Sequence, residues 1–236
     1  LTLVGNATSA VVENVGFLSP GGSNQAGGSF AFNSTTPSTG GASTINLTSQ
    51  GGKALSMVFS GFRNNPGGGI VTLNADANSQ FRTTAANSAA GLLATNAFIN
   101  GRWITNDGTG KIVAARGTTL NDLGQWQSTQ NVEVTAPTTG GLTVSRIGAI
   151  TFSGANATVA LDGASNPGGT GALTVTSSGI LVAPDFTGTL AQITGGRLLS
   201  ELPYSTAAAS GLMIANNKSG AVLRITSNVG QSDAPL

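Results

Sequence analysis

Two carboxylates in this sequence have a spacing that acid–base chemistry could use. Asp185 and Glu201 are close enough in the sequence that one turn of a coiled β-structure could bring their side chains together. Paired carboxylates of this kind cleave glycosidic bonds, with one group acting as the acid and the other as the base or nucleophile. The other acids are scattered singly along the chain, and Asp107 and Asp162 each precede a glycine, which is typical of turns.

Histidine and cysteine are both absent from the chain. Without histidine there is neither a Ser-His-Asp triad nor a histidine-based zinc site, and without cysteine there is no disulfide and no thiolate metal site. The glycine-rich runs at 64–69 and 166–171 contain no carboxylate and precede no Lys-Ser or Lys-Thr pair, so they predict tight turns. We therefore expect no catalytic residues, no metal and no cofactor, and we expect that the protein is not an enzyme. A polysaccharide-degrading enzyme that uses Asp185 and Glu201 is the alternative.

Aromatic side chains offer a second kind of chemistry, which is carbohydrate binding. Trp103, Trp126 and Tyr204 could stack on the face of a sugar ring, and Arg102 beside Trp103 could add a cation–π contact. The structural alternative is that both tryptophans cover apolar surface inside the fold, because tryptophan is usually well buried. Both interpretations stay open: a carbohydrate-binding module that contacts surface glycans, or packing.

The segment around Trp103 has the pattern of a β-hairpin. In "RWIT-NDGTG-KIVAA" (102–115), two apolar runs are separated by an Asn-Asp-Gly turn signal, with Arg102 and Lys111 on either side of the turn. The sequence predicts a hairpin insertion over 98–116 that protrudes from the main fold.

The elements that must position these side chains are short strands. The chain has 35 glycines, and β-branched residues dominate its apolar set, a composition that disfavours helices and favours strands. The best helical candidates, 86–98 and 200–212, are interrupted by glycine or proline and predict a turn or two at most. Expected strands lie at 1–4, 10–18, 29–33, 43–49, 54–61, 69–75, 102–105, 111–115, 131–136, 141–147, 149–154, 157–163, 172–177, 179–183, 190–194, 196–200, 212–216 and 221–227.

An internal repeat in the C-terminal half indicates how these strands pair. "GLTVSRIGAITFSG" at 141 aligns with "ALTVTSSGILVAPD" at 172, and "GLMIANNKSGAVLRIT" at 211 forms a looser third copy. Aliphatic triplets that recur in this way can stack on one another inside a coil. The pattern favours an all-β fold built as a parallel β-solenoid, with 1–236 forming a single segment. A β-sandwich in the N-terminal half (1–75) is the alternative.

These motifs follow one another in an order that resembles a known family. The order "FINGRWITNDGTGKIVA", "NVEVTA", "GLTVSRIGAITFSGANATVAL", "GALTVTSSGILVA", "ITGGRLLSEL" and "LMIANNKSGAVLRITSNV" is similar to the passenger proteins built from autotransporter-associated β-strand repeats. Trp103, Asn106, Asp107, Gly108 and 112–114 occupy the corresponding places, although the tyrosine-rich part of the family's hairpin is reduced here to "TGKIVA". The resemblance covers about 97–230. It implies a right-handed β-helix displayed outside a Gram-negative cell, and it implies no catalytic residues.

Composition narrows the classes of partner. Only 8% of the residues are charged and the formal net charge is +1. The sequence shows no clustered excess of lysine and arginine, so we expect no nucleic-acid binding. The apolar runs are all far shorter than a membrane-spanning helix needs, so we expect no membrane insertion. The absence of cysteine is typical of a bacterial exported protein. We expect an extracellular or cell-surface structural protein, an adhesin or a self-assembling fibre, whose chain is processed or part of something longer. Its expected partner is another copy of itself or a surface glycan.

Overall fold

The structure, a computed structural model, describes residues 1–20, 30–32, 42–62, 69–161, 171–200 and 212–231. Within these ranges the regular structure consists of β-strands and one short 3-10 helix, η1 (Leu123–Gln125). The predicted all-β class is confirmed. The first helical candidate is replaced in its second half by a strand, β8 (Ala94–Ile99), and the second, 200–212, falls almost entirely outside the described residues.

The chain divides into two compact units, residues 1–115 and 116–236. Each unit has a hydrophobic cluster of its own, so two separate cores form instead of one core that grows along the chain. The single β-solenoid segment expected over 1–236 depends on how the units join, and it stays a prediction. The units are described one at a time below.

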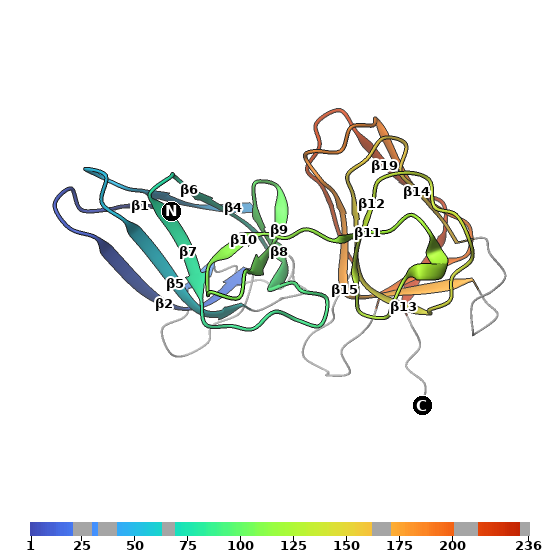
Figure 1. Cartoon of the computed structure of the whole chain (residues 1–236), viewed down its shortest axis with the longest axis horizontal. Helices are drawn as coiled ribbons and strands as arrows, with labels where there is room; N and C mark the ends of the chain where they lie inside the picture. Colours follow the sequence, from blue (N-terminus) through green and yellow to red (C-terminus); the bar gives the residue numbers. More distant parts are fainter. Residues whose placement is uncertain (21–29, 33–41, 63–68, 162–170, 201–211, 232–236) are drawn as a thin grey trace. The chain divides into compact units, whose positions relative to one another are not determined.

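The first unit contains two sheets (Figure 1). Its six-stranded sheet has the order β1 (Thr2–Val4), β4 (Ala42–Thr48), β6 (Ile70–Ala75), β8, β9 (Arg102–Asn106) and β10 (Ile112–Ala114). Its four-stranded sheet has the order β3 (Phe30–Phe32), β2 (Val11–Pro20), β5 (Leu55–Phe62) and β7 (Ser79–Thr83).

Strands of the first unit that are far apart in the sequence pair in parallel. Thr2 lies opposite Asn46, and Val11 lies opposite Leu55. Among the described strands up to β8, each pairing is parallel. A sandwich joined by hairpin turns requires antiparallel neighbours, so the hairpin connectivity of the β-sandwich alternative is wrong for this half.

The core of the first unit lies between its two sheets. Alternation along β4 buries Ile45 and Leu47, and alternation along β5 buries Leu55, Met57 and Phe59, as expected for strands with one covered face. All five side chains belong to one cluster, which therefore joins the two sheets by apolar burial.

The hairpin predicted over 98–116 is confirmed, but it does not protrude. β9 and β10 pair antiparallel, with Thr105 opposite Val113, and β9 also pairs antiparallel with β8. Ile104 and Ile112 are 0% and 3% exposed and belong to the core cluster of the first unit. Burial of these two side chains favours a hairpin that extends the sheet over one that leaves it.

The second unit is built from strands that return to the same place once per turn of the chain (Figure 1). Its larger sheet contains β11 (Thr118–Thr119), β12 (Asn131–Val134), β13 (Arg146–Phe152), β15 (Ala172–Val182), β17 (Arg197–Ser200), β18 (Met213–Asn216) and β20 (Asn228–Gln231). Its smaller sheet contains β14 (Thr158–Ala160), β16 (Leu190–Thr194) and β19 (Val222–Ile225).

These strands form three parallel columns. The first column runs through β12, the ends of β13 and β15, and β18. The second runs through the starts of β13 and β15, then β17 and β20, and the third through β14, β16 and β19. One passage of the chain through the columns is called a rung below.

Like aliphatic side chains are stacked from rung to rung in the interior. Ile150 lies opposite Ile180 in the first column, Leu173 opposite Leu198 in the second, and Ile193 opposite Ile225 in the third. All but the last of these six are fully buried, and all three columns contribute to one cluster. This stacking explains why the repeat is visible in the sequence.

The rung-to-rung register differs from the alignment that the repeat predicted. Alignment of position 141 with position 172 would place Ala149 opposite Ile180, whereas the structure places Ile150 there. A slip by a single position reverses which side chains face the core, so burial of Ile150 and Phe152 decides the register. The third copy is also shifted, because alignment of 172 with 211 would pair Ile180 with Ser219, and its partner is Ile214.

Candidate functional site

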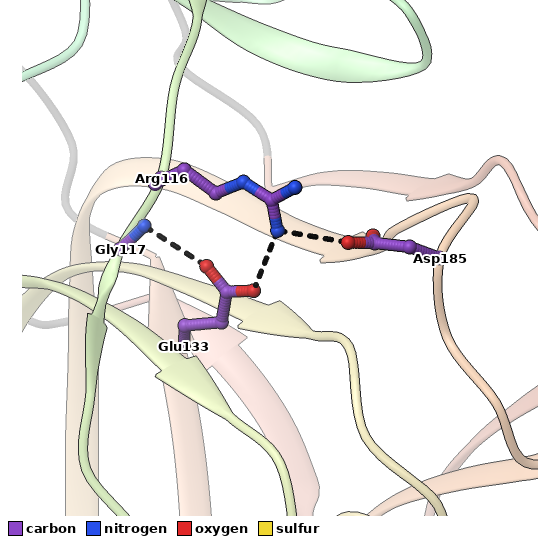
Figure 2. A network of polar contacts seen from close by, with 4 residues as sticks. All are labelled: Arg116, Gly117, Glu133 and Asp185. Carbon is purple, nitrogen blue, oxygen red and sulfur yellow. Dashed lines mark hydrogen bonds and ion pairs between the residues drawn. The ribbon is translucent and has the colours of Figure 1, made fainter.

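One guanidinium in the second unit contacts two carboxylates (Figure 2). The Nη1 atom of Arg116 lies 2.8 Å from Oδ2 of Asp185 and 3.5 Å from Oε1 of Glu133. The second oxygen of Glu133, Oε2, accepts a hydrogen bond from the backbone N–H of Gly117 at 3.2 Å. We call these four residues the Arg116 cluster.

Local sequence explains how the cluster is assembled. Glu133 stands between Val132 and Val134 of β12, whose side chains fill the core, so its own side chain points to the opposite face. Pairing of β11 with β12 brings Gly117 against this strand. A Cβ atom on Gly117 would lie 2.8 Å from the backbone nitrogen of Glu133, so only glycine fits this close approach. Asp185 follows β15.

The cluster joins segments of the second unit that are far apart in the sequence. The Glu133 side chain is 7% exposed, whereas those of Arg116 and Asp185 are 65% and 43% exposed. Both carboxylates already accept contacts from the same guanidinium nitrogen. These contacts attach residues 116–117 and the segment around Asp185 to β12. They do not resemble two carboxylates placed on opposite sides of a substrate.

Replacement of Arg116 by alanine is expected to lower the free energy of unfolding by at most about 1 kcal/mol, because exposed ion pairs contribute little. The loss should shrink further at high salt, which screens exposed charges. Urea denaturation at low and high salt measures both effects, with Asp185→Asn as the variant that removes the charge of one partner and keeps the guanidinium. A loss of several kcal/mol that does not depend on salt would contradict this.

The predicted pair of Asp185 and Glu201 is described only in part. Asp185 contacts Arg116, as above, and Glu201 lies outside the described residues. The sequence did not indicate Glu133 as a member of any site. The available signal was a single acid between two valines in "NVEVTA", an alternation that places the acid on the face of the strand away from the core.

The aromatic candidates for carbohydrate binding are placed as follows. Trp103 and Trp126 are each 1% exposed, and Arg102 is 3% exposed. The Cα of Trp103 lies opposite that of Phe98 in the β8–β9 pair, and Trp126 belongs to the core of the second unit. Neither indole ring presents a face to solvent. Of the two interpretations that the sequence allowed, carbohydrate binding and packing, this burial matches packing. Tyr204 lies outside the described residues.

The hairpin turn is held by its own polar side chains. Oδ1 of Asp107 accepts hydrogen bonds from the N–H and hydroxyl of Thr109, both at 2.8 Å, and from the N–H of Lys111 at 3.2 Å. Oδ1 of Asn106 accepts from the N–H groups of Gly108 and Gly110 at 3.0 Å each. The turn role predicted for Asp107 is confirmed.

We expect the hairpin turn to loosen in acid. The hydroxyl of Thr109 and, secondly, its N–H lower the pKa of Asp107 below the ordinary value of 3.8. Because the pKa is lower in the folded state, ionised Asp107 stabilises the turn above about pH 3.8, and this stabilisation is lost as the pH falls through the folded value. Backbone amide shifts of Thr109 and Lys111, followed by NMR during an acid titration, measure the change.

Asp107→Asn is the matched control for that titration. An asparagine side-chain oxygen can accept the same turn hydrogen bonds without titrating, so the turn should persist and its amide shifts should stay flat. An identical acid transition in both proteins would show that another group is responsible.

No family model, curated protein or solved structure matches the chain. Within the described ranges, no three carboxylates gather closely enough to hold a metal ion. The same part of the chain contains no helix with the length and apolar character that a membrane crossing requires.

Proposed function

We propose that the second unit is a three-sided, right-handed parallel β-solenoid, and that the chain is a structural or adhesive element on the outside of a bacterial cell. The observation that carries this proposal is the set of three parallel columns, each of which gains one strand per turn of the chain. Rungs of this kind contact only their neighbours, which produces a long and regular body.

The mechanism of such an element is mechanical. Backbone hydrogen bonds run from rung to rung, and the stacked aliphatic side chains exclude water from the interior. A low content of charge suits this stacking, because like charges placed opposite each other in neighbouring strands destabilise a sheet. Engagement of Glu133 and Asp185 by the same guanidinium supports a role without catalysis.

The extracellular location is supported by the sequence. The order of motifs over about 97–230 resembles passenger proteins displayed by Gram-negative bacteria, and the chain contains no cysteine. Detection of the chain on intact cells that encode it, by antibody labelling or by protease treatment, tests this part of the proposal. Labelling that requires permeabilised cells would reject a surface location.

An engineered disulfide tests the solenoid itself. Thr158 lies opposite Gln192 in the third column, on the face away from the core. Neighbouring strands are about 4.8 Å apart, within the Cα separation that a disulfide spans. The chain has no native cysteine, so Thr158→Cys with Gln192→Cys should form one internal disulfide on oxidation, detected by mass spectrometry after proteolysis.

The matched control shifts one partner along the same face. Thr158→Cys with Thr194→Cys places the second thiol at the next outward-facing position of β16, beyond the reach of a relaxed disulfide. Oxidation of the control at the same rate as the first pair, or failure of the first pair, would reject the column.

A further inference from the structure

A pocket with a volume of about 250 Å³ lies on the first unit, where the hairpin meets β7. An isolated antiparallel bridge joins Lys111 to Arg82 of β7, the strand at one end of the four-stranded sheet. The polar residues that line the pocket are Asn78, Ser79, Gln80 and Lys111. Because ligand sites are concave and place a few polar groups around one space, this pocket is a candidate binding site.

The pocket stays open because its other lining residues are small. They are Gly52, Ala54 and Ala77. Gly52 has a φ of +68°, a left-handed conformation that favours glycine, and a Cβ atom there would have open space around it. The turn that contains Gly52 therefore places a residue without a side chain beside the pocket.

Hydrogen bonds within the first unit hold the polar residues of the pocket in place. Oδ2 of Asp76 accepts hydrogen bonds from the N–H and the hydroxyl of Ser49 at 2.6 and 2.8 Å, and its Oδ1 accepts one from the N–H of Asn78 at 3.2 Å. Nε2 of Gln80 donates to Oγ of Ser56 at 3.0 Å, which leaves the amide oxygen of Gln80 as an acceptor. Because these groups are positioned before a ligand arrives, the cost of ordering them on binding is reduced.

Ser79 brings a buried hydroxyl to the pocket. The residue is 9% exposed, and its Oγ makes no hydrogen bond of ordinary geometry, although the hydroxyl lies close enough to the Asp76 carboxylate to lower the pKa of that group. Buried hydroxyls nearly always have a hydrogen-bond partner, because a buried polar group without one is destabilising. Since Ser79 lines the pocket, a polar group of a bound molecule can be that partner.

Lys111 gives the pocket a positive charge. It is the one charged residue among those that line the pocket, and it forms no ion pair within the described residues. Arg82, its neighbour across the bridge, adds a second positive charge, with Nη2 donating to the carbonyl oxygen of Thr109 at 2.9 Å. Two acids in the adjoining turns, Asp76 and Asp107, accept hydrogen bonds within those turns. A carboxylate that enters the pocket therefore meets the amine of Lys111, and the two charges attract.

We propose that this pocket of the first unit binds an acidic sugar residue, such as a uronic acid. The carboxylate contacts Lys111, and the sugar hydroxyls form hydrogen bonds with Asn78, Ser79 and Gln80, whose side chains both donate and accept as hydroxyls require. Pockets for drug-sized ligands measure about 300–1,000 Å³, so this smaller pocket fits a single sugar ring. The inference goes beyond the proposed structural function and depends neither on the solenoid nor on the location of the chain.

An NMR titration of the full chain with sodium glucuronate tests the site. The backbone amide signals of Asn78, Ser79, Gln80 and Lys111 should shift and reach saturation. Glucose has the hydroxyls without the carboxylate, and acetate has the carboxylate without the hydroxyls, so each should bind at least tenfold more weakly than glucuronate. Shifts that are absent or do not saturate would overturn the proposal. Equal binding of acetate would overturn recognition of a sugar, and equal binding of glucose would overturn recognition of the charge.

Substitution of the lysine separates a specific contact from general attraction. Lys111→Met removes the charge and keeps an unbranched side chain, and Lys53→Met is the matched control, because Lys53 is an exposed lysine of the same unit that does not line the pocket. Lys111→Met should weaken glucuronate binding at least tenfold, Lys53→Met should leave it unchanged, and Lys111→Arg should retain most of it. Equal weakening by the two methionine variants would show attraction to the overall charge of the protein and would overturn the site.

A bulky side chain tests the pocket without changing charge. Ala77→Leu fills the space from an exposed turn position, whereas Ala89→Leu makes the same change at an exposed turn position that does not line the pocket. Ala77→Leu should abolish the saturable shifts and Ala89→Leu should preserve them, with circular dichroism confirming that both variants fold. Full binding by Ala77→Leu would overturn the site. A chain that forms the Thr158–Gln192 disulfide and labels on intact cells, yet never binds glucuronate, would reject this inference alone and leave the proposed function standing.

Discussion

Replacement of Trp126 by alanine is expected to lower the free energy of unfolding of the second unit by about 3–5 kcal/mol, the usual cost of deleting a buried aromatic side chain. Trp126 is 1% exposed and follows η1, where it packs in the same cluster as Leu123 and Val132. Its Nε1–H also donates a hydrogen bond to the carbonyl oxygen of Leu120 at 3.3 Å. The ring therefore contributes apolar burial and fixes the segment that precedes β12.

Trp126→Phe is the control that separates packing from the hydrogen bond. It keeps an aromatic ring and removes the donor, so its cost should be about 1 kcal/mol plus that of the smaller ring. Urea denaturation followed by circular dichroism gives both values, provided that the m-value is unchanged. If Trp126 were instead a platform for sugars, Trp126→Ala would unfold normally and lose binding on a glycan array.

The strand content and the parallel pairing of the second unit could be predicted from the sequence because both depend on local pattern. Aliphatic triplets recur at nearly constant spacing, and side chains such as Ile150 and Ile180 stack because equivalent positions of successive rungs face the same interior. The hairpin was equally visible, since Asn106 and Asp107 satisfy the turn with their own side chains and need no distant partner.

The register and the division into units could not be obtained in the same way. The pairing of β13 with β15 shifts between Ile147 and Ala149, because β15 advances further along the chain than β13 does over the same stretch. An alignment of the repeat by residue type uses one constant spacing and cannot include such an irregularity. It is therefore wrong by one position at Ile150, whose partner is Ile180. Each of the two cores depends on contacts between strands that are far apart in the sequence within its own unit, which local periodicity does not contain.

The candidate site was missed because its members are distant in the sequence and ordinary in type. Arg116, Glu133 and Asp185 form no motif, and their association follows from the pairing of β11 with β12 and from the position of the chain after β15. The aromatic candidates were selected for their type alone. Trp103 and Trp126 are buried because their rings are large and apolar, which their identity already favoured.

Gly154→Ala is expected to lower the free energy of unfolding of the second unit by about 1–3 kcal/mol, the typical cost of overpacking. Gly154 lies at the corner after β13, where the chain passes directly over Thr135, the residue after β12. The neighbouring N–H of Ser153 donates to the carbonyl oxygen of Val134 at 3.1 Å, which fixes the two corners together. A Cβ atom on Gly154 would overlap the carbonyl group of Thr135.

Gly230→Ala in β20 is the matched control for Gly154→Ala. Its nearest neighbour for a new Cβ is Cδ2 of Leu199 at 3.5 Å, an ordinary contact. This substitution should therefore be neutral or stabilise by up to about 1 kcal/mol, because alanine restricts the unfolded chain. Since backbone packing at Gly154 depends on successive rungs being in contact, equal unfolding free energies for the two variants would contradict the close stacking of β12 on β13. A large difference between them, measured in the same urea titration, is the expected result.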